Sequence, residues 1–214
     1  MPLSLRTVRV ESSVGCADRP ITVDEFLGMF DEDASAELVD GTVVFAMAAE
    51  YDHEALCAFL LSLLKIYVEK RGLGVALGSR SLVQVDPYTG LMPDVLFIRS
   101  DRLGIIQKTK IAGPPDLVVE IVSPSESEPE LIRKRVKYER LGVGELWVID
   151  RRRRKVKALR LGEGGVYEPI PIEGGVLRSE AVEGFWLKTE WLFAEPEGMP
   201  KVLEALEIIE EEER

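Results

Sequence analysis

The chain has 214 residues and a formal net charge of −11 at pH 7, with 46% hydrophobic and 30% charged residues. This composition is typical of one globular domain, and its acidic balance argues against a protein that coats nucleic acid non-specifically. No stretch approaches the roughly 18 apolar residues of a membrane-spanning helix, and the N-terminus lacks a signal-peptide core. We therefore expect a cytoplasmic protein with no membrane partner.

The charge is unevenly distributed along the chain. Residues 126–160 contain twelve lysines and arginines against six acidic residues, whereas residues 195–214 contain eight acidic residues and two basic ones. The densest basic stretch, "RRRRK" at residues 151–155, is typical of a solvated hairpin turn, and a patch that contacts phosphates is the alternative. The acidic average therefore hides a basic segment.

The first predicted elements are a short helix and a hairpin. Thr22 and Glu25 form a capping box, which indicates a helix that begins there and runs to Phe30. The stretch "AELVDGTVVF" that follows predicts a hairpin, because Asp40 and Gly41 supply the two turn residues with positive φ.

The remaining predicted elements alternate between helices and strands. The stretch "HEALCAFLLSLLKIYVEKRG" has helical spacing of apolar residues and ends at Gly72, which is typical of a helix C-terminus. Strands are then expected around residue 75 and at residues 82–85, 95–98 and 117–122, followed by a basic helix at 130–141 and a strand at 145–150. Short hairpin strands are expected at 155–161, 166–172 and 176–179, and a tail helix at 201–209. We predict one α/β domain at residues 21–193, between an N-terminal extension (1–20) and an acidic C-terminal helical tail (194–214).

One ionisable residue interrupts the most apolar of these strands. In "PPDLVVEIVSPSES", Glu120 lies within a β-branched run, and a glutamate is almost never fully buried unless something pairs with it. An edge position, where the carboxylate reaches water or an arginine, is the alternative. Asp94 opens an earlier strand-like run, and the intervening segment is long enough for the two strands to pair. Adjacent carboxylates repel each other, so a hard cation such as Mg²⁺ is their expected partner.

Several motifs occur in an ordered set that resembles the Uma-two family of putative restriction endonucleases, a branch of the PD-(D/E)XK nuclease superfamily. The resemblance covers nearly the whole chain, over residues 21–193. The motifs that carry it are "ELVDG" (37–41), His53 at the start of the long helix, "PDV" (93–95), "PPDLVVEIVSPS" (114–125), Lys134 four residues before Tyr138, and "GVGELWVID" (142–150).

The resemblance implies an α/β fold with a restriction-endonuclease-like core, in which helices flank a mixed β-sheet with added β-hairpins. It also implies a metal site. Asp94 matches the acid of the PD motif and Glu120 the acid of (D/E)XK, and the backbone carbonyl of Ile121 would join them in holding Mg²⁺ or Mn²⁺. Glu37 would be a third catalytic acid, and an exposed hairpin residue is the alternative for it.

The chain departs from the superfamily pattern at the lysine. The lysine of the pattern follows the acid by two residues, where this chain has Val122. Within the family the role passes to the following helix, which points to Lys134, with Lys137 as the rival. The geometry permits this, because Glu120 and Lys134 would each lie about 7 Å from the strand–helix connection. A solvated lysine on the helix face is the alternative for each.

The resemblance implies a metal-dependent endonuclease that hydrolyses DNA phosphodiester bonds, with Asp94, Glu120, Lys134 and Glu37 as catalytic residues. His53 is expected to cap or pack at the rim of the site, with a general base as the alternative. A catalytically inactive member that binds nucleic acid or protein is the second functional class, and a structural or regulatory subunit is the third.

We also expect a homodimer. Restriction-type nucleases that cut both strands commonly pair two sites, and the tail helix offers an apolar stripe that a lone domain would expose.

Overall fold

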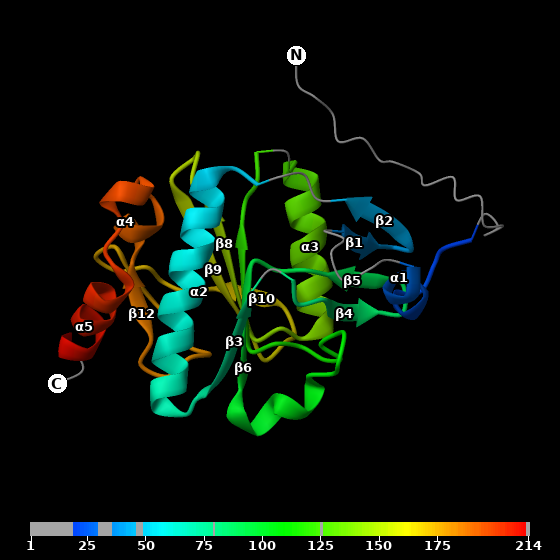
Figure 1. Ribbon diagram of the computed structural model, residues 1–214, viewed down its shortest axis with the longest axis horizontal. Helices are drawn as coiled ribbons and strands as arrows, with labels where there is room; N and C mark the ends of the chain where they lie inside the picture. Colours follow the sequence, from blue (N-terminus) through cyan, green and yellow to red (C-terminus); the bar gives the residue numbers. More distant parts are fainter. Residues whose placement is uncertain (1–18, 30–35, 46–48, 79, 125, 213–214) are drawn as a thin grey trace, which may run out of the picture.

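The computed structural model describes residues 19–29, 36–45, 49–78, 80–124 and 126–212 (Figure 1). Most of the predicted N-terminal extension lies outside these residues, as does Phe30. The core is a six-stranded mixed sheet in the order β10-β9-β8-β7-β6-β3, in which β7 and β8 are parallel and the other neighbours are antiparallel. Its strands are β3 (Gly74–Gly78), β6 (Val95–Arg99), β7 (Leu117–Ile121), β8 (Glu145–Asp150), β9 (Lys155–Leu161) and β10 (Tyr167–Pro169).

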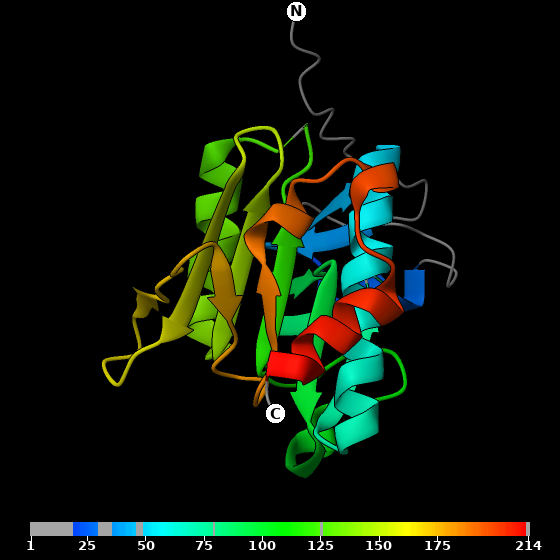
Figure 2. The same ribbon diagram turned by 90° about the vertical axis from the view of Figure 1, so that its left-hand side faces the viewer.

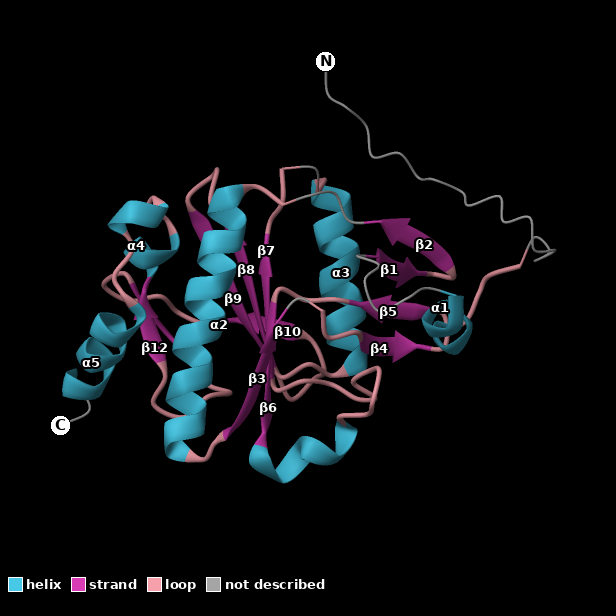
Figure 3. Cartoon of the chain, viewed as in Figure 1, coloured by secondary structure: helices cyan, strands magenta, loops and turns pink. Residues whose placement is uncertain are grey.

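Two long helices cover opposite faces of this sheet, α2 (Tyr51–Arg71) and α3 (Glu128–Leu141) (Figure 3). Because side chains alternate between the faces of a strand, Trp147 of β8 packs with α2, whereas Leu146 packs on the side of α3. Each helix ends at a glycine with positive φ, as sequence spacing predicts for Gly72. The mixed sheet flanked by helices that the resemblance implies is confirmed.

A second, four-stranded sheet lies beyond α3, in the order β2-β1-β5-β4 (Figure 1). The predicted hairpin is confirmed, with φ of 50° at Asp40 and 75° at Gly41. The Thr22 capping box is confirmed as well, because the amide of Thr22 donates to the carboxylate of Glu25, 2.8 Å away. The elements of this part are α1 (Val23–Met29), β1 (Ala36–Val39), β2 (Thr42–Phe45), β4 (Val83–Asp86) and β5 (Thr89–Leu91).

The C-terminal part of the chain packs on the face of the sheet that α2 covers (Figure 2). Its tail helix presents its buried residues to α2, where they join the core, so the apolar stripe of the tail is largely covered within one chain. The remaining elements are η1 (Ser100–Ile105), β11 (Val176–Arg178), β12 (Trp186–Lys188), α4 (Thr189–Leu192), η2 (Pro196–Gly198) and α5 (Val202–Glu212). In the part of the chain that the structure describes, no helix is long and apolar enough to cross a membrane.

Candidate active site

The two acids of the predicted metal site lie beside each other, since Asp94 directly precedes β6 and Glu120 belongs to the neighbouring strand β7. β6 and β7 pair antiparallel, with Val95 opposite Val119, so Asp94 lies opposite Glu120 one residue further on. The Oδ2 atom of Asp94 accepts a hydrogen bond from the amide of Ile121 at 2.7 Å, which ties the start of β6 to the end of β7. The predicted strand pairing therefore brings both acids to one end of the sheet.

Glu120 is buried, with 5% of its surface exposed, and its carboxylate points to α3. Its Oε1 atom accepts a hydrogen bond from the hydroxyl of Tyr138, and its Oε2 atom lies 3.3 Å from Nζ of Lys134. Burial raises the pKa of Glu120 to about 8; the ammonium of Lys134 opposes this rise, and the charge of Asp94 adds to it. The edge position proposed as an alternative for Glu120 is wrong, because β7 lies between β6 and β8.

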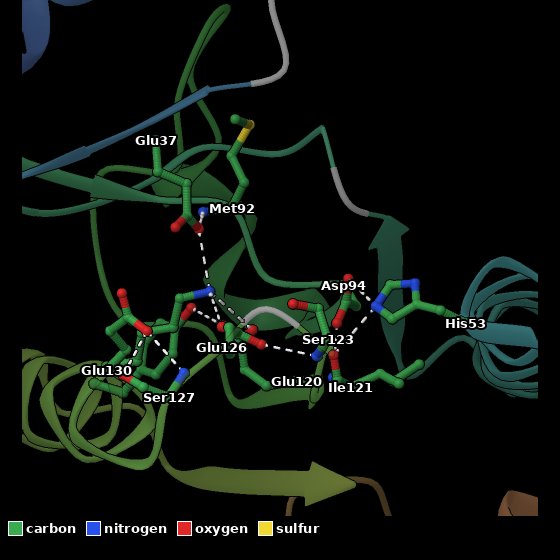
Figure 4. Close-up of polar contacts among 12 residues, drawn as sticks. Glu37, His53, Met92, Asp94, Glu120, Ile121, Ser123, Glu126, Ser127 and Glu130 are labelled. Carbon is green, nitrogen blue, oxygen red and sulfur yellow. Dashed lines mark hydrogen bonds and ion pairs between the residues drawn. The ribbon is translucent and has the colours of Figure 1, made fainter. Parts of the chain in front are cut away.

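Lys134 lies at the centre of a group of carboxylates. Its Nζ atom is 3.5 Å from Glu37, 3.3 Å from Glu120 and 3.3 Å from Glu126 (Figure 4 shows the three glutamates). Burial by itself lowers the pKa of Lys134, but these carboxylates outweigh burial and hold the pKa well above its ordinary value. The lysine is therefore protonated at neutral pH. It is not the solvated helix-face lysine that was its alternative.

The rival lysine points elsewhere. The Nζ atom of Lys137 lies 2.5 Å from Oδ1 of Asp40 and 3.4 Å from the hydroxyl of Thr89, so it reaches the turn of the β1–β2 hairpin. This follows from helix geometry, because three residues rotate the side chain by about 300° around the axis. Among the described residues, only Lys134 of the two contacts Glu120.

Glu37 faces this same group. Its Oε1 atom accepts a hydrogen bond from the amide of Met92 at 2.8 Å, and only 16% of its side chain is exposed (Figure 4). The alternative that Glu37 is an exposed hairpin residue is therefore wrong. The amide of Ser123 donates to Glu126, and this hydrogen bond positions Glu126 beside Lys134.

His53 lies inside the site rather than at its rim. Its Nε2 atom is 3.1 Å from the carbonyl oxygen of Ile121 and 3.5 Å from Oδ1 of Asp94 (Figure 4). Its other ring nitrogen lies 3.5 Å from Sγ of Cys57, one turn along α2. The hydrogen bond with Asp94, followed by that with Cys57, raises the pKa of His53 to about 11, despite burial. Sequence analysis missed this contact, because only the packing of α2 on β7 determines where the first turn of the helix points.

The chemistry of these residues fits the metal that the resemblance implies. The carboxylate of Asp94 and the carbonyl of Ile121 both approach Nε2 of His53. Glu120 directly precedes Ile121 on β7, with its carboxylate directed to α3. Oxygen ligands of this kind suit Mg²⁺ and Mn²⁺. The ligand atoms of His53, Cys57 and Asp94 also lie within 4.8 Å of one another, so a nitrogen ligand is within reach of the same ion.

Comparison with known proteins agrees with this geometry. A family model, Uma2, described as "Putative restriction endonuclease", matches residues 23–190. The chain is similar to a solved structure from Anabaena variabilis ATCC 29413, which its title describes as a putative nuclease belonging to DUF820. The two share 21% identity over 81% of this chain and 98% of the other, with a TM-score of 0.67, so this likeness concerns the fold. No curated protein matches the chain.

Proposed function

Since the chain belongs to the Uma-two (Uma2) family of putative restriction endonucleases, we propose that it is a metal-dependent endonuclease that hydrolyses DNA phosphodiester bonds. One observation carries the proposal. Lys134 comes from a helix that follows Glu120 in the sequence, yet its ammonium lies 3.3 Å from the carboxylate of Glu120, which in turn lies beside Asp94. A basic group beside two acids on paired strands is an arrangement that suits phosphodiester hydrolysis.

The metal would be held by Asp94, Glu120 and the carbonyl of Ile121, with His53 as a nitrogen ligand once its ring loses its proton. A divalent ion bound there lowers the pKa of a bound water and offsets the charge of the phosphate. Tyr138 supports this set indirectly, because its hydroxyl donates to Glu120 and fixes the orientation of that carboxylate.

Lys134 would act through its charge, because its ammonium would balance the negative charge that develops on the phosphate. Glu37 and Glu126 hold that ammonium in place at 3.5 and 3.3 Å, and both would keep it protonated. Glu37 is the third acid of the proposed catalytic set, and its hydrogen bond from the amide of Met92 fixes its position.

The alternative is a member of the same fold that binds nucleic acid or protein without cleaving it. The observation that favours it is Val122, which stands where the superfamily pattern has its lysine. Lys134 supplies an ammonium beside Glu120 from another element, so the absence of a lysine at position 122 does not leave the acids without a basic partner.

Incubation of the purified protein with supercoiled plasmid distinguishes these functions. We expect nicked and linear DNA to appear with Mn²⁺ or Mg²⁺ and no cleavage with EDTA. The Asp94→Asn variant, purified identically, controls for a contaminating nuclease and should be inactive. Intact plasmid in every divalent ion would reject the endonuclease and favour the binding protein.

The protein is further proposed to act as a homodimer, because an enzyme that cuts both strands commonly pairs two active sites. The buried face of α5 is used within the chain, but the outer face of this helix exposes Leu203 by 64% and Ile208 by 37%. These two exposed apolar side chains are the part of the tail helix that would contact the second protomer of the dimer.

A further inference from the structure

Basic side chains without an acidic partner are concentrated on α3 and β9. Most lysines and arginines that the structure describes form ion pairs, including Arg151, Arg152 and Arg153 of the turn before β9. In the described part of the chain, those that form no ion pair with a carboxylate are Lys108, Arg133, Arg135, Arg140, Arg154, Lys155 and Lys157. All but Lys108 belong to α3 or to the β8–β9 hairpin, although the chain as a whole has a net charge of −11.

Two of these lysines lie on the same face of the sheet as Glu120, the face that α3 covers. Glu120 of β7 pairs with Val148 of β8, and Val148 pairs with Lys157 of β9, so the three residues form one row across the sheet. Val148 packs against the apolar cluster that contains Tyr138 on the α3 side, which places Lys157 on that side as well. Lys155, two residues earlier on β9, shares this face.

The distance along this row is short. Neighbouring strands lie about 4.8 Å apart, so the backbone of Lys157 is about 10 Å from that of Glu120. Both Lys155 and Lys157 are exposed. A long lysine side chain at this position reaches a phosphate close to one held at Glu120.

Arg135 contributes from the helix. It follows Lys134 directly, and one residue rotates the side chain by about 100°, away from Glu120 and along the flank of α3. Glu139 lies four residues after Arg135 and therefore on the same side of α3. Its carboxylate accepts a hydrogen bond from the amide of Tyr167 in β10, so this side of α3 faces β10. Arg135 therefore lies on the side of α3 that faces β9 and β10, and it is exposed.

We propose that Arg135, Lys155 and Lys157, here called the cationic flank, bind the phosphates of the DNA strand next to the scissile phosphate. This inference rests on the proposed function, because it takes the phosphate at Glu120 as its starting point. Basic side chains that form no ion pair within the protein can neutralise DNA phosphates with their full charge. Phosphate contacts of this kind position the DNA on the protein without recognising its base sequence.

The rest of the molecule favours this side for DNA. The acidic tail helix α5 packs on the opposite face of the sheet, with α2 (Figures 1 and 2). Its carboxylates would repel DNA there, whereas the cationic flank attracts it, so the two together orient the substrate across α3 and β9. A chain of net charge −11 can thus bind DNA through one local surface.

The test uses DNA binding rather than cleavage. In an Asp94→Asn background, a triple variant carries Arg135→Gln, Lys155→Gln and Lys157→Gln. A matched triple variant carries Lys108→Gln, Lys188→Gln and Lys201→Gln, which removes the same charge from surface positions elsewhere. Binding of a fluorescent DNA duplex is measured by anisotropy between about 50 and 200 mM salt, because affinity that depends on phosphate contacts falls steeply over this range.

We expect the cationic-flank variant to bind DNA roughly tenfold or more weakly at 50 mM salt. Its slope of log K against log salt should become shallower by about 0.9 for each phosphate that the variant no longer neutralises. The matched variant should change the affinity by less than about twofold. Unchanged melting temperatures in both variants show that the fold is retained.

The outcomes separate this inference from the proposed function. Equal affinity losses in the two triple variants, or none in either, would overturn the cationic flank, even if the wild-type protein cleaves plasmid. Failure of the Asp94→Asn protein to bind duplex DNA would overturn it too. A loss of DNA affinity in the cationic-flank variant, and not in the matched variant, supports DNA binding by the cationic flank. This holds even if the wild-type protein binds DNA without cutting it, a result that would reject only the proposed endonuclease activity.

Discussion

The Nζ atom of Lys134 lies 3.3 Å from Oε2 of Glu120, although the two residues belong to a helix and a strand fourteen positions apart in the sequence. The helix returns antiparallel to β7 after its crossover loop, so its second turn lies beside the end of the strand. This contact places an ammonium against a buried acid, and its charge opposes the rise that burial causes in the pKa of Glu120.

The first prediction is that Lys134→Ala removes most Mn²⁺-supported plasmid cleavage, by a factor of about 10² to 10³, because the ammonium acts mainly in the transition state. Lys137→Ala is the matched control, since Lys137 contacts Asp40 instead, and it should reduce cleavage less. Rates are measured by gel densitometry with both variants at equal concentration. If Lys134→Ala cleaves like the wild type while Glu120→Gln is inactive, the assignment of Lys134 is wrong.

The second prediction concerns the metal. Millimolar Mn²⁺ or Mg²⁺ should raise the melting temperature, because an ion that binds only the folded state stabilises it by about 2.7 kcal/mol at a hundred times its Kd. Asp94→Asn should lose this rise, and Lys134→Ala should retain it. Glu54→Gln is the control, because it removes an exposed carboxylate next to His53. An equal rise in the wild type and Asp94→Asn would place the ion elsewhere.

The third prediction follows from the pKa of Glu120, which burial raises from an ordinary 4.5 to about 8. Between these pH values the folded state binds a proton that the unfolded state has released, so the stability of the metal-free protein should fall as pH rises, by at most about 1.4 kcal/mol per pH unit. Glu120→Gln cannot release this proton and should show a smaller fall.

The informative window for this comparison is pH 4.5 to 6.5. His53, whose pKa is raised from 6.5 to about 11, adds its own loss of stability only above that window. Urea unfolding in EDTA gives the free energy of unfolding of both proteins at each pH. Parallel curves for the wild type and Glu120→Gln would show that Glu120 does not hold the extra proton.

The fourth prediction is that light scattering gives a mass near twice 23.9 kDa at micromolar concentration. Leu203→Glu, which places a charge on the exposed face of α5 without touching its buried face, should shift the population toward the monomer. Its melting temperature should stay within a few degrees of the wild type. A mass near 24 kDa across that concentration range would refute the homodimer.

The sequence by itself determined the features that depend on neighbouring residues. The hairpin turn at Asp40 and Gly41 follows from the conformations that those two residues tolerate, and the capping box at Thr22 follows from the hydrogen-bonding chemistry of its side chains. The apolar run around Glu120 likewise predicts a buried strand, and the buried acid in it points to a charged or metal partner before any contact is known. The strand-like run that Asp94 opens supplied a second acid, and the family motifs added Lys134.

Only the tertiary structure decided which residues from distant segments meet. His53 contacts Ile121 because α2 packs on the sheet with its first turn beside the end of β7, and no local pattern in the sequence encodes that docking. The rotation of α3 likewise directs Lys134 to Glu120 and Lys137 to Asp40. The physical reason is that propensity, capping and periodicity act within a few residues, whereas strand register and helix packing depend on the whole core closing at once.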